Sequence, residues 1–274
     1  MPSMEVSSIR IRGIKVIVKK MKRTGLITEN DKIITQGSSM RIVLSCVMVL
    51  YVFLLGMPVI SEIIRNEKSV QRTFYLEFVF RYFEDSRMLY ILPVVATLPY
   101  SAQLIDEIKG GYIRICLSRI NRKAYIRSKL LTTFICGGEV LMIGVVLSVG
   151  AAFIIFSGIS EKGVSEDSDL IRLIKLMILL FLLGGLYSLI GLFSSVIVNN
   201  RYLAWTGAFI IEFILLILTK RYLRDCIIIN PENWLTGINE WPLSGWSVHL
   251  WIGILTIFAA GVSYKTVWNR IKQI

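Results

Sequence analysis

Long stretches almost free of charge constrain this chain more than any other feature of its sequence. In a helix, about 20 apolar residues are needed to cross the ~30 Å hydrocarbon core of a bilayer. Six runs approach or exceed that length, at residues 42–60, 88–105, 130–156, 170–198, 203–219 and 247–264. The sequence therefore predicts an all-α, polytopic membrane protein with about six transmembrane helices.

The composition favours a single membrane domain over a soluble one. Of the 274 residues, 54% are hydrophobic and 18% are charged, whereas about 25% of a soluble domain is charged. The polar stretches between the runs are too short to bury a core of their own. We expect a cytoplasmic N-terminal segment at residues 1–41, a six-helix transmembrane domain at residues 42–264 and a cytoplasmic tail at residues 265–274.

The second run is the most irregular of the six. It is short and contains Pro93 and Pro99. Proline removes a backbone hydrogen bond and clashes with the preceding turn of a helix. We therefore expect residues 88–105 to be kinked or partly unwound.

The basic charge of the chain predicts its orientation. A net charge of +12 would suggest nucleic acid as a partner of a soluble protein, but here the charges lie mostly at the ends of the runs. With both termini in the cytoplasm, about two thirds of the 31 Lys and Arg residues are cytoplasmic and most acids are external. Basic residues are favoured on the inside. We expect a multi-pass protein of the plasma (cytoplasmic) membrane, N-in and C-in, with no nucleic acid as partner.

The N-terminal segment mixes basic and apolar residues between Ser8 and Arg23. This composition suits an amphipathic helix lying on the anionic cytoplasmic leaflet and contacting membrane lipids. The alternation also fits a strand, and a solvated basic tail would serve orientation equally well.

The cytoplasmic segment at residues 106–129 is the most informative part of the chain. Two acids precede the pair Gly110 and Gly111, and apolar residues mixed with Lys and Arg follow. The glycines permit a tight turn, and Asn121 is a suitable N-cap for a helix that continues into the third run. This pattern predicts a short helix across the inner face followed by an elbow. It would rest on lipid headgroups, dock on a cytoplasmic partner, or serve orientation alone.

The order of residues in this segment resembles the permease subunits of ABC transporters of the type-2 exporter class. In that family the segment forms a coupling helix that docks on an ATPase subunit, and two permease subunits, identical or paralogous, pair in the membrane. Many relatives carry a proline near residues 117–120, where this chain has none. The resemblance implies contacts with the ATPase at the following positions: Glu107, Gly110, Gly111, Arg114, Ser118, Arg119, Arg122, Tyr125 and Lys129.

The chain has no Gly-x-x-x-x-Gly-Lys-Ser/Thr loop to cradle ATP phosphates. We therefore expect it not to be an enzyme and to bind no cofactor, with ATP and Mg²⁺ on the partner ATPase. The expected substrate is amphipathic and taken from the membrane. An antimicrobial or toxin peptide is the first candidate, and a lipid-like molecule or a drug is the second.

Two acids lie inside apolar runs. A carboxylate in the bilayer is costly, so Glu139 and Glu212 are expected to face the bundle interior. They would line a substrate path, act in gating, or tie helices together through a hydrogen bond. They also leave open a secondary transporter. An intramembrane hydrolase is a remote alternative, because His249 is the single histidine and neither a metal-binding nor a catalytic motif includes it.

Overall fold

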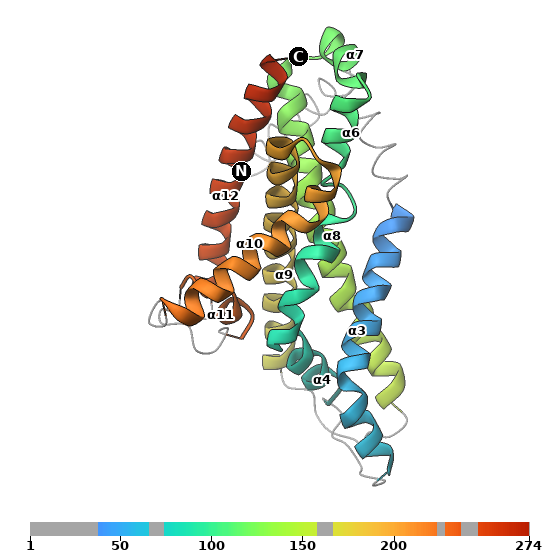
Figure 1. Ribbon diagram of the computed structural model, residues 1–274. Coiled ribbons are helices and arrows are strands. Elements are labelled where there is room, and N and C mark those ends of the chain that lie inside the picture. The colour runs from blue at the N-terminus through green and yellow to red at the C-terminus, as the bar shows by residue number, and fades with distance from the viewer. Residues whose placement is uncertain (1–37, 66–73, 158–166, 224–227, 237–245, 274) are drawn as a thin grey trace, which may run out of the picture.

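The computed structural model describes residues 38–65, 74–157, 167–223, 228–236 and 246–273, and every regular element in these ranges is a helix. Figure 1 shows long helices lying side by side, with short helices at both ends of the bundle. The all-α prediction is confirmed for the described chain. The predicted amphipathic helix between Ser8 and Arg23 lies outside the described residues.

Five described helices are long and apolar enough to cross a membrane, which indicates a multi-pass membrane protein. These helices are α3 (Ser38–Arg65), α8 (Arg122–Phe156), α9 (Asp167–Val198), α10 (Arg201–Arg221) and α12 (Ser247–Lys272). The last of them extends beyond the predicted run. Residues 265–272, expected as part of a separate tail, continue α12, and their side chains at Val267 and Ile271 are buried.

The second predicted run is not one continuous helix. Three pieces take its place: the 3-10 helix η1 (Ser86–Tyr90), α5 (Leu92–Thr97) and α6 (Gln103–Lys109). Pro93 lies in the first turn of α5, where a missing N–H costs little. Pro99 lies in the turn between α5 and α6. The expected interruption is therefore confirmed, and whether this segment crosses the bilayer as a sixth span stays a prediction.

Hydroxyl groups satisfy backbone carbonyls around this interruption. Ser188 Oγ of α9 donates to the Ala96 carbonyl at 2.6 Å, and Ser101 Oγ donates to the Ser188 carbonyl at 3.1 Å. Thr97 Oγ1 donates to the Trp205 carbonyl of α10 at 2.9 Å. Broken helices are tolerated at membrane depth only where such partners replace the lost backbone bonds. These bonds fasten the interruption to α9 and α10.

Helix α9 is the centre of the bundle and packs against α5, α8, α10 and α12. Its contact with α8 depends on small residues, which let helix backbones approach closely. A Cβ atom on Gly184 would lie 2.4 Å from the carbonyl oxygen of Gly137. Gly150, further along α8, is not part of this contact, because a Cβ there would meet nothing within 4 Å.

An aromatic helix, α4 (Phe74–Phe83), packs against α3 and α8. Its side chains at Phe78, Phe80 and Phe83 are buried. The ring centroids of Phe74 and Phe156 lie 5.2 Å apart in an edge-to-face arrangement. Helix α4 therefore extends the core of the bundle.

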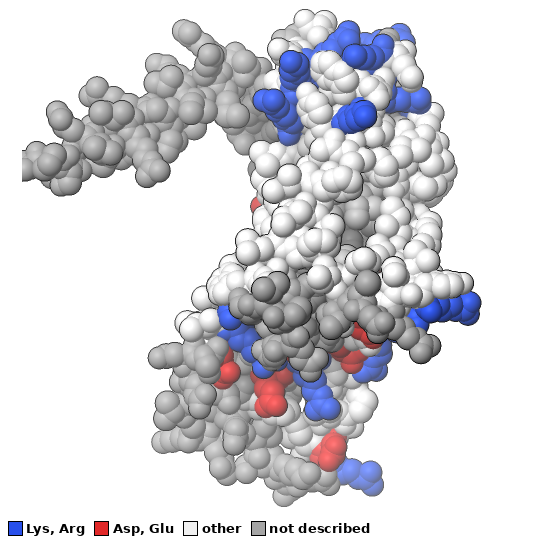
Figure 2. All heavy atoms as spheres, turned by 90° about the vertical axis from the view of Figure 1, so that its left-hand side faces the viewer, with Lys and Arg blue, Asp and Glu red and all other residues white. Residues whose placement is uncertain are grey.

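The two ends of the bundle differ in charge. We call the end that carries α7 (Tyr112–Arg119), the first turns of α8 and the last turns of α12 the basic end. Figure 2 shows Lys and Arg gathered there, an uncharged belt below them, and acids mixed with basic residues beyond the belt. This distribution is typical of a protein that crosses a bilayer.

An ion pair braces the end opposite to the basic end. Arg172 donates to both carboxylate oxygens of Glu84 at 2.9 Å, and its Cζ lies 4.5 Å from the ring centroid of Phe80. Burial raises the pKa of Glu84 above its usual value, although Arg172 acts in the opposite direction. The pair ties the end of α4 to α9.

Replacing Gly184 by Ala is expected to separate α8 from α9. The new methyl group would overlap the Gly137 backbone, and overpacking of this kind costs about 1–3 kcal/mol. Thermal unfolding of the detergent-purified protein should show a lower midpoint. Gly150→Ala is the matched control, because it adds the same methyl group in open space. Equal midpoints for the two variants would contradict the close packing at Gly184.

Candidate functional site

The segment from α6 to the first turns of α8 forms the candidate site at the basic end of the bundle (Figure 1). It contains the short helix that the sequence predicted between the glycine pair and Asn121. This helix, α7, begins at Tyr112 and ends at Arg119. Three local features decide its position: the turn before it, its buried face and the elbow after it.

The turn before α7 requires glycine at one position. Gly111 has a φ of 71°, in the left-handed region that favours glycine. A Cβ there would meet nothing within 4 Å. Glycine is therefore favoured by the backbone conformation, since a side chain would not clash with its neighbours. Gly110 has a φ of −73° and ends α6 with ordinary helical geometry. The sequence treated the two glycines alike, and the structure separates their roles.

Helix α7 has one buried face and one exposed face. Ile113 is fully buried and Cys116 nearly so, in a cluster that includes Ile126 of α8 and Ile271 of α12. The three-residue spacing places Ile113 and Cys116 on one side of the helix. Tyr112, Arg114, Ile115 and Ser118 are exposed on the remaining surface, with Ile115 at 58% exposure. The buried face thus packs on the bundle, and the exposed face presents a mixed basic and apolar surface.

The elbow after α7 is capped as the sequence predicted. Ile120 adopts an extended conformation and ends the helix. The side chain of Asn121 accepts a hydrogen bond from the backbone N–H of Lys123 at 3.1 Å, which satisfies one of the free amides at the start of α8. The predictions of the short helix, the elbow and the N-cap are confirmed.

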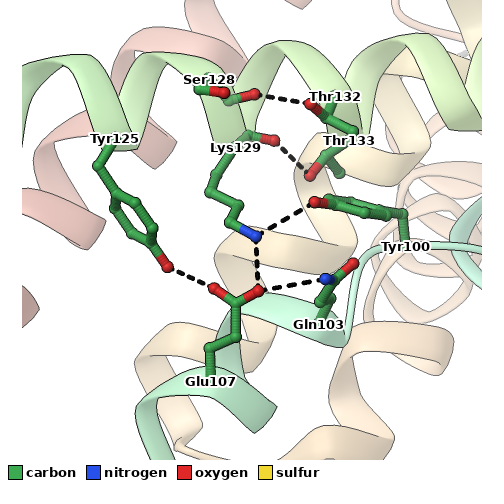
Figure 3. A network of polar contacts seen from close by, with 8 residues as sticks. All are labelled: Tyr100, Gln103, Glu107, Tyr125, Ser128, Lys129, Thr132 and Thr133. Atoms are coloured by element: carbon green, nitrogen blue, oxygen red, sulfur yellow. Dashed lines mark hydrogen bonds and ion pairs between the residues drawn. The ribbon is translucent and has the colours of Figure 1, made fainter. Parts of the chain in front are cut away.

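A buried polar network lies where α6 meets α8 (Figure 3). Lys129 Nζ contacts Glu107 Oε1 at 2.5 Å and Tyr100 Oη at 3.3 Å. Tyr125 donates its hydroxyl hydrogen to Glu107 Oε2, and Gln103 Nε2 donates to Oε1 at 3.1 Å. The Lys129 and Glu107 side chains are only 8% and 11% exposed. Both oxygens of the carboxylate therefore have partners.

The network joins α6 to α8 through an ion pair and hydrogen bonds. The charges of Lys129 and Glu107 are nearly shielded from water, so removing one of them would leave the other buried without its counter-charge. Both Tyr100 and Tyr125 present their rings to Lys129 Nζ, with centroids 5.7 Å away, which adds cation–π attraction. A displacement of α6 would consequently be transmitted to α8.

The predicted site residues divide into two groups. Arg114, Ser118 and Arg122 are exposed, as expected of residues that contact a partner. Glu107, Tyr125 and Lys129 instead point into the network, and their contact with a partner stays a prediction. Gly110 and Gly111 form the turn. The side chain of Arg119 lies outside the described residues.

The sequence reading missed Tyr100 and Gln103 as members of this network. The signal was their spacing from Glu107, since Tyr100, Gln103 and Glu107 follow one another by three and four residues and would share one face of a helix. Pro99 and the interruption of the run obscured this periodicity. The sequence also does not show that the Lys129 side chain points inward, because Lys129 is one of several basic residues in the segment.

Glu139 pairs with a cation that the sequence placed outside the membrane domain. Arg41, in the first turn of α3, contacts the Glu139 carboxylate through Nη1. Nearby, Ser45 Oγ donates to the Val140 carbonyl at 2.9 Å. These contacts fasten α3 to α8 and favour the interhelical tie among the roles considered for Glu139.

Glu212 is buried on α10 and is 4% exposed. Its Oε1 accepts a hydrogen bond from the Tyr187 hydroxyl of α9 at 2.9 Å. This contact matches the interhelical hydrogen bond that the sequence left open as one role. Among the described residues, Oε2 of Glu212 has no hydrogen-bond partner.

His249 lies at the start of α12, and its Nε2 is 2.9 Å from the Lys175 carbonyl oxygen. A serine nucleophile would need this ring as its base within hydrogen-bond reach. The contact instead joins α12 to α9, so the described geometry offers the hydrolase alternative no support.

No protein-family model matches this chain, and comparison with curated proteins gives no match. The fold and the geometry of the segment at the basic end therefore carry the functional argument.

Replacing Lys129 by Met is expected to destabilise the junction of α6 and α8. Breaking a buried ion pair from one side costs about 3–5 kcal/mol, because the Glu107 carboxylate stays buried without its counter-charge. We expect a lower thermal midpoint in detergent and faster trypsin cleavage after Arg114. Adding Glu107→Leu should restore much of the stability.

Arg122→Met is the control for this experiment, because Arg122 is exposed on the first turn of α8. It removes the same type of charge outside the network and should leave the midpoint unchanged. Equal effects of Lys129→Met and Arg122→Met, or a double variant no more stable than the single one, would contradict the network.

Proposed function

We propose that this chain is the membrane-spanning permease subunit of an ATP-driven exporter that resembles the type-2 class of ABC transporters. The exposed surface of α7 carries the proposal, because this short helix stands beyond the uncharged belt at the basic end while its other face is fixed to the bundle. Such a helix offers a rigid docking surface to a partner. Its position along the chain is that of the coupling helix in the family it resembles.

The basic end faces the cytoplasm in this proposal. Lys and Arg favour the cytoplasmic side of a membrane protein, and Figure 2 shows them concentrated at this end. The segment 88–105 then crosses the membrane as an interrupted sixth span, and the N-terminal and C-terminal segments of the chain lie in the cytoplasm. A cytoplasmic ATPase subunit, which binds ATP and Mg²⁺, would reach α7 directly.

Movement of the ATPase would reach the membrane through the contacts of α7. The helix is joined through Gly111 to α6, packs on α12 and continues through Asn121 into α8. Glu107 and Lys129 bind α6 to α8, so these helices move together. Two docked permease subunits would shift between inward-open and outward-open states, and nucleotide can drive this shift only through its differential affinity for those states.

The proposed substrate is amphipathic and enters from the membrane. An antimicrobial or toxin peptide is the first candidate, and a lipid-like molecule or a drug is the second. A second permease subunit, identical or paralogous, would complete the transport path.

Replacing Ile115 by Asp is expected to release the ATPase. Ile115 is the most exposed apolar residue of α7, and loss of a central contact residue in an interface commonly weakens binding about tenfold or more. The measurement is the amount of ATPase subunit that co-purifies with the tagged permease from its native membranes.

The control is Leu131→Asp, because Leu131 is similarly exposed on α8 but lies beyond the α7 surface. We expect it to retain the ATPase if the variant inserts. Undiminished ATPase with Ile115→Asp, or none with the native chain, would overturn the docking proposal.

Replacing Gly111 by Val is expected to uncouple ATP hydrolysis from transport. A β-branched residue at positive φ costs about 1–2 kcal/mol and would change the direction of the turn. Reconstituted vesicles should hydrolyse ATP with reduced export per ATP. Gly110→Ala is the matched control, since Gly110 has an ordinary φ. Unchanged coupling in Gly111→Val would count against transmission through this turn.

A secondary transporter is the second candidate, and the buried carboxylate of Glu212 favours it. Glu139 fits this alternative less well, because it is paired with Arg41. Transport by the isolated chain in vesicles with an ion gradient and without ATPase would replace the exporter proposal.

A further inference from the structure

A groove of about 230 Å³ lies between α9, α10 and α12, with α11 (Pro231–Thr236) at its border. Its volume is several times the ~30 Å³ that one water molecule occupies in the liquid. The lining is almost entirely apolar and includes Leu186, Phe193, Ile211, Leu215, Leu255 and Phe258. A site of this composition suits a hydrocarbon tail.

Glu212 interrupts the apolar lining. Its Oε1 accepts the hydrogen bond from Tyr187, whereas its Oε2 has no partner among the described residues. Buried polar atoms nearly always have a hydrogen-bond partner in folded proteins. As a carboxylate, Glu212 therefore lacks a donor to Oε2 among the described residues.

The groove is accessible from the side of the bundle. Phe258 lines it and is 70% exposed on α12, so this wall borders the surroundings of the helices. Glu212 lies 11 positions after Arg201, the first residue of α10, which places it about 16 Å from the basic end of that helix. In a bilayer, an amphiphile would reach the groove sideways from the hydrocarbon layer.

We propose that this groove binds a cationic amphiphile: a primary amine whose ammonium group donates to Oε2 of Glu212 and whose apolar tail occupies the lining. An ammonium group supplies the missing donor and neutralises a carboxylate that would be costly alone at this depth. The rings of Tyr187 and Trp234 border the same space and favour a cation by cation–π attraction. An acidic amphiphile would meet a like charge.

This inference does not require an ATPase. Binding of an amine to the groove concerns α9, α10 and α12, whereas docking concerns α7 at the basic end. Loss of one can therefore be observed while the other persists. If both hold, the groove gives the exporter a preference for cationic substrates.

The test uses the full chain in phosphatidylcholine nanodiscs with a dodecylamine that carries a photoactivatable diazirine at the far end of its tail. Mass spectrometry of the cross-linked peptides should place the label on groove residues of α10 and α12, such as Leu215 and Leu255. Excess dodecylamine should compete, and dodecanol of equal chain length should compete about tenfold less well.

Glu212→Gln keeps the shape of the side chain and should lower the groove labelling about tenfold. Phe213→Ala is the control, because Phe213 is the next residue of α10 but faces outward and is 45% exposed; it should label as the native chain does. Ala259→Trp is a second test variant, which fills the groove and leaves Glu212 in place. It should abolish labelling even if Glu212→Gln does not fold.

Three outcomes would overturn the proposal. One is equal groove labelling in the native chain and in the folded variants Glu212→Gln or Ala259→Trp. Another is dodecanol competing as well as dodecylamine, which would reveal a merely apolar surface. The third is labelling spread evenly over the exposed helix faces.

Discussion

Every polar group inside the apolar layer of this protein needs a partner from the chain itself, and this constraint organises the bundle. The interrupted segment between η1 and α6 persists because Thr97, Ser101 and Ser188 donate to carbonyls across helix boundaries. These bonds tie the interrupted segment to α9 and α10. The same demand draws Arg41 to Glu139 and Lys129 to Glu107. Each of these ion pairs thus connects two helices that do not follow one another directly along the chain.

These buried polar groups are distributed unevenly along the bundle. The pair Glu107 and Lys129 lies near the basic end and holds α6 and α8 directly beneath α7. One face of α7 consequently packs on the bundle while the other face is exposed. This combination suits transmission of force from a partner. Glu212 lies in the groove between α9, α10 and α12, and one of its oxygens has no hydrogen-bond partner among the described residues. The proposed docking surface and the proposed ligand groove therefore lie in different parts of the molecule.

Helix positions could be predicted from the sequence because apolar runs of sufficient length have few alternatives in a bilayer. The Asn121 cap and the interruption at Pro99 were equally readable, since each follows from local backbone chemistry. The partners of Glu139 and Lys129 could not be predicted, because ion pairs between distant helices depend on the rotation of each helix about its axis. For the same reason, the sequence assigned Glu107 and Tyr125 to a contact surface, although their side chains face inward.

The orientation of the basic end is the claim on which the exporter account depends, and cysteine labelling tests it directly. In a variant lacking its four native cysteines, Ser118→Cys places a thiol on the exposed face of α7. Glu62→Cys places a thiol in the last turns of α3, at the end of the bundle opposite to the basic end. A membrane-impermeant maleimide should label Ser118→Cys in inside-out vesicles but not in intact cells, and Glu62→Cys in intact cells. Labelling of Ser118→Cys in intact cells would place α7 outside the cell, beyond reach of a cytoplasmic ATPase, and would contradict the account.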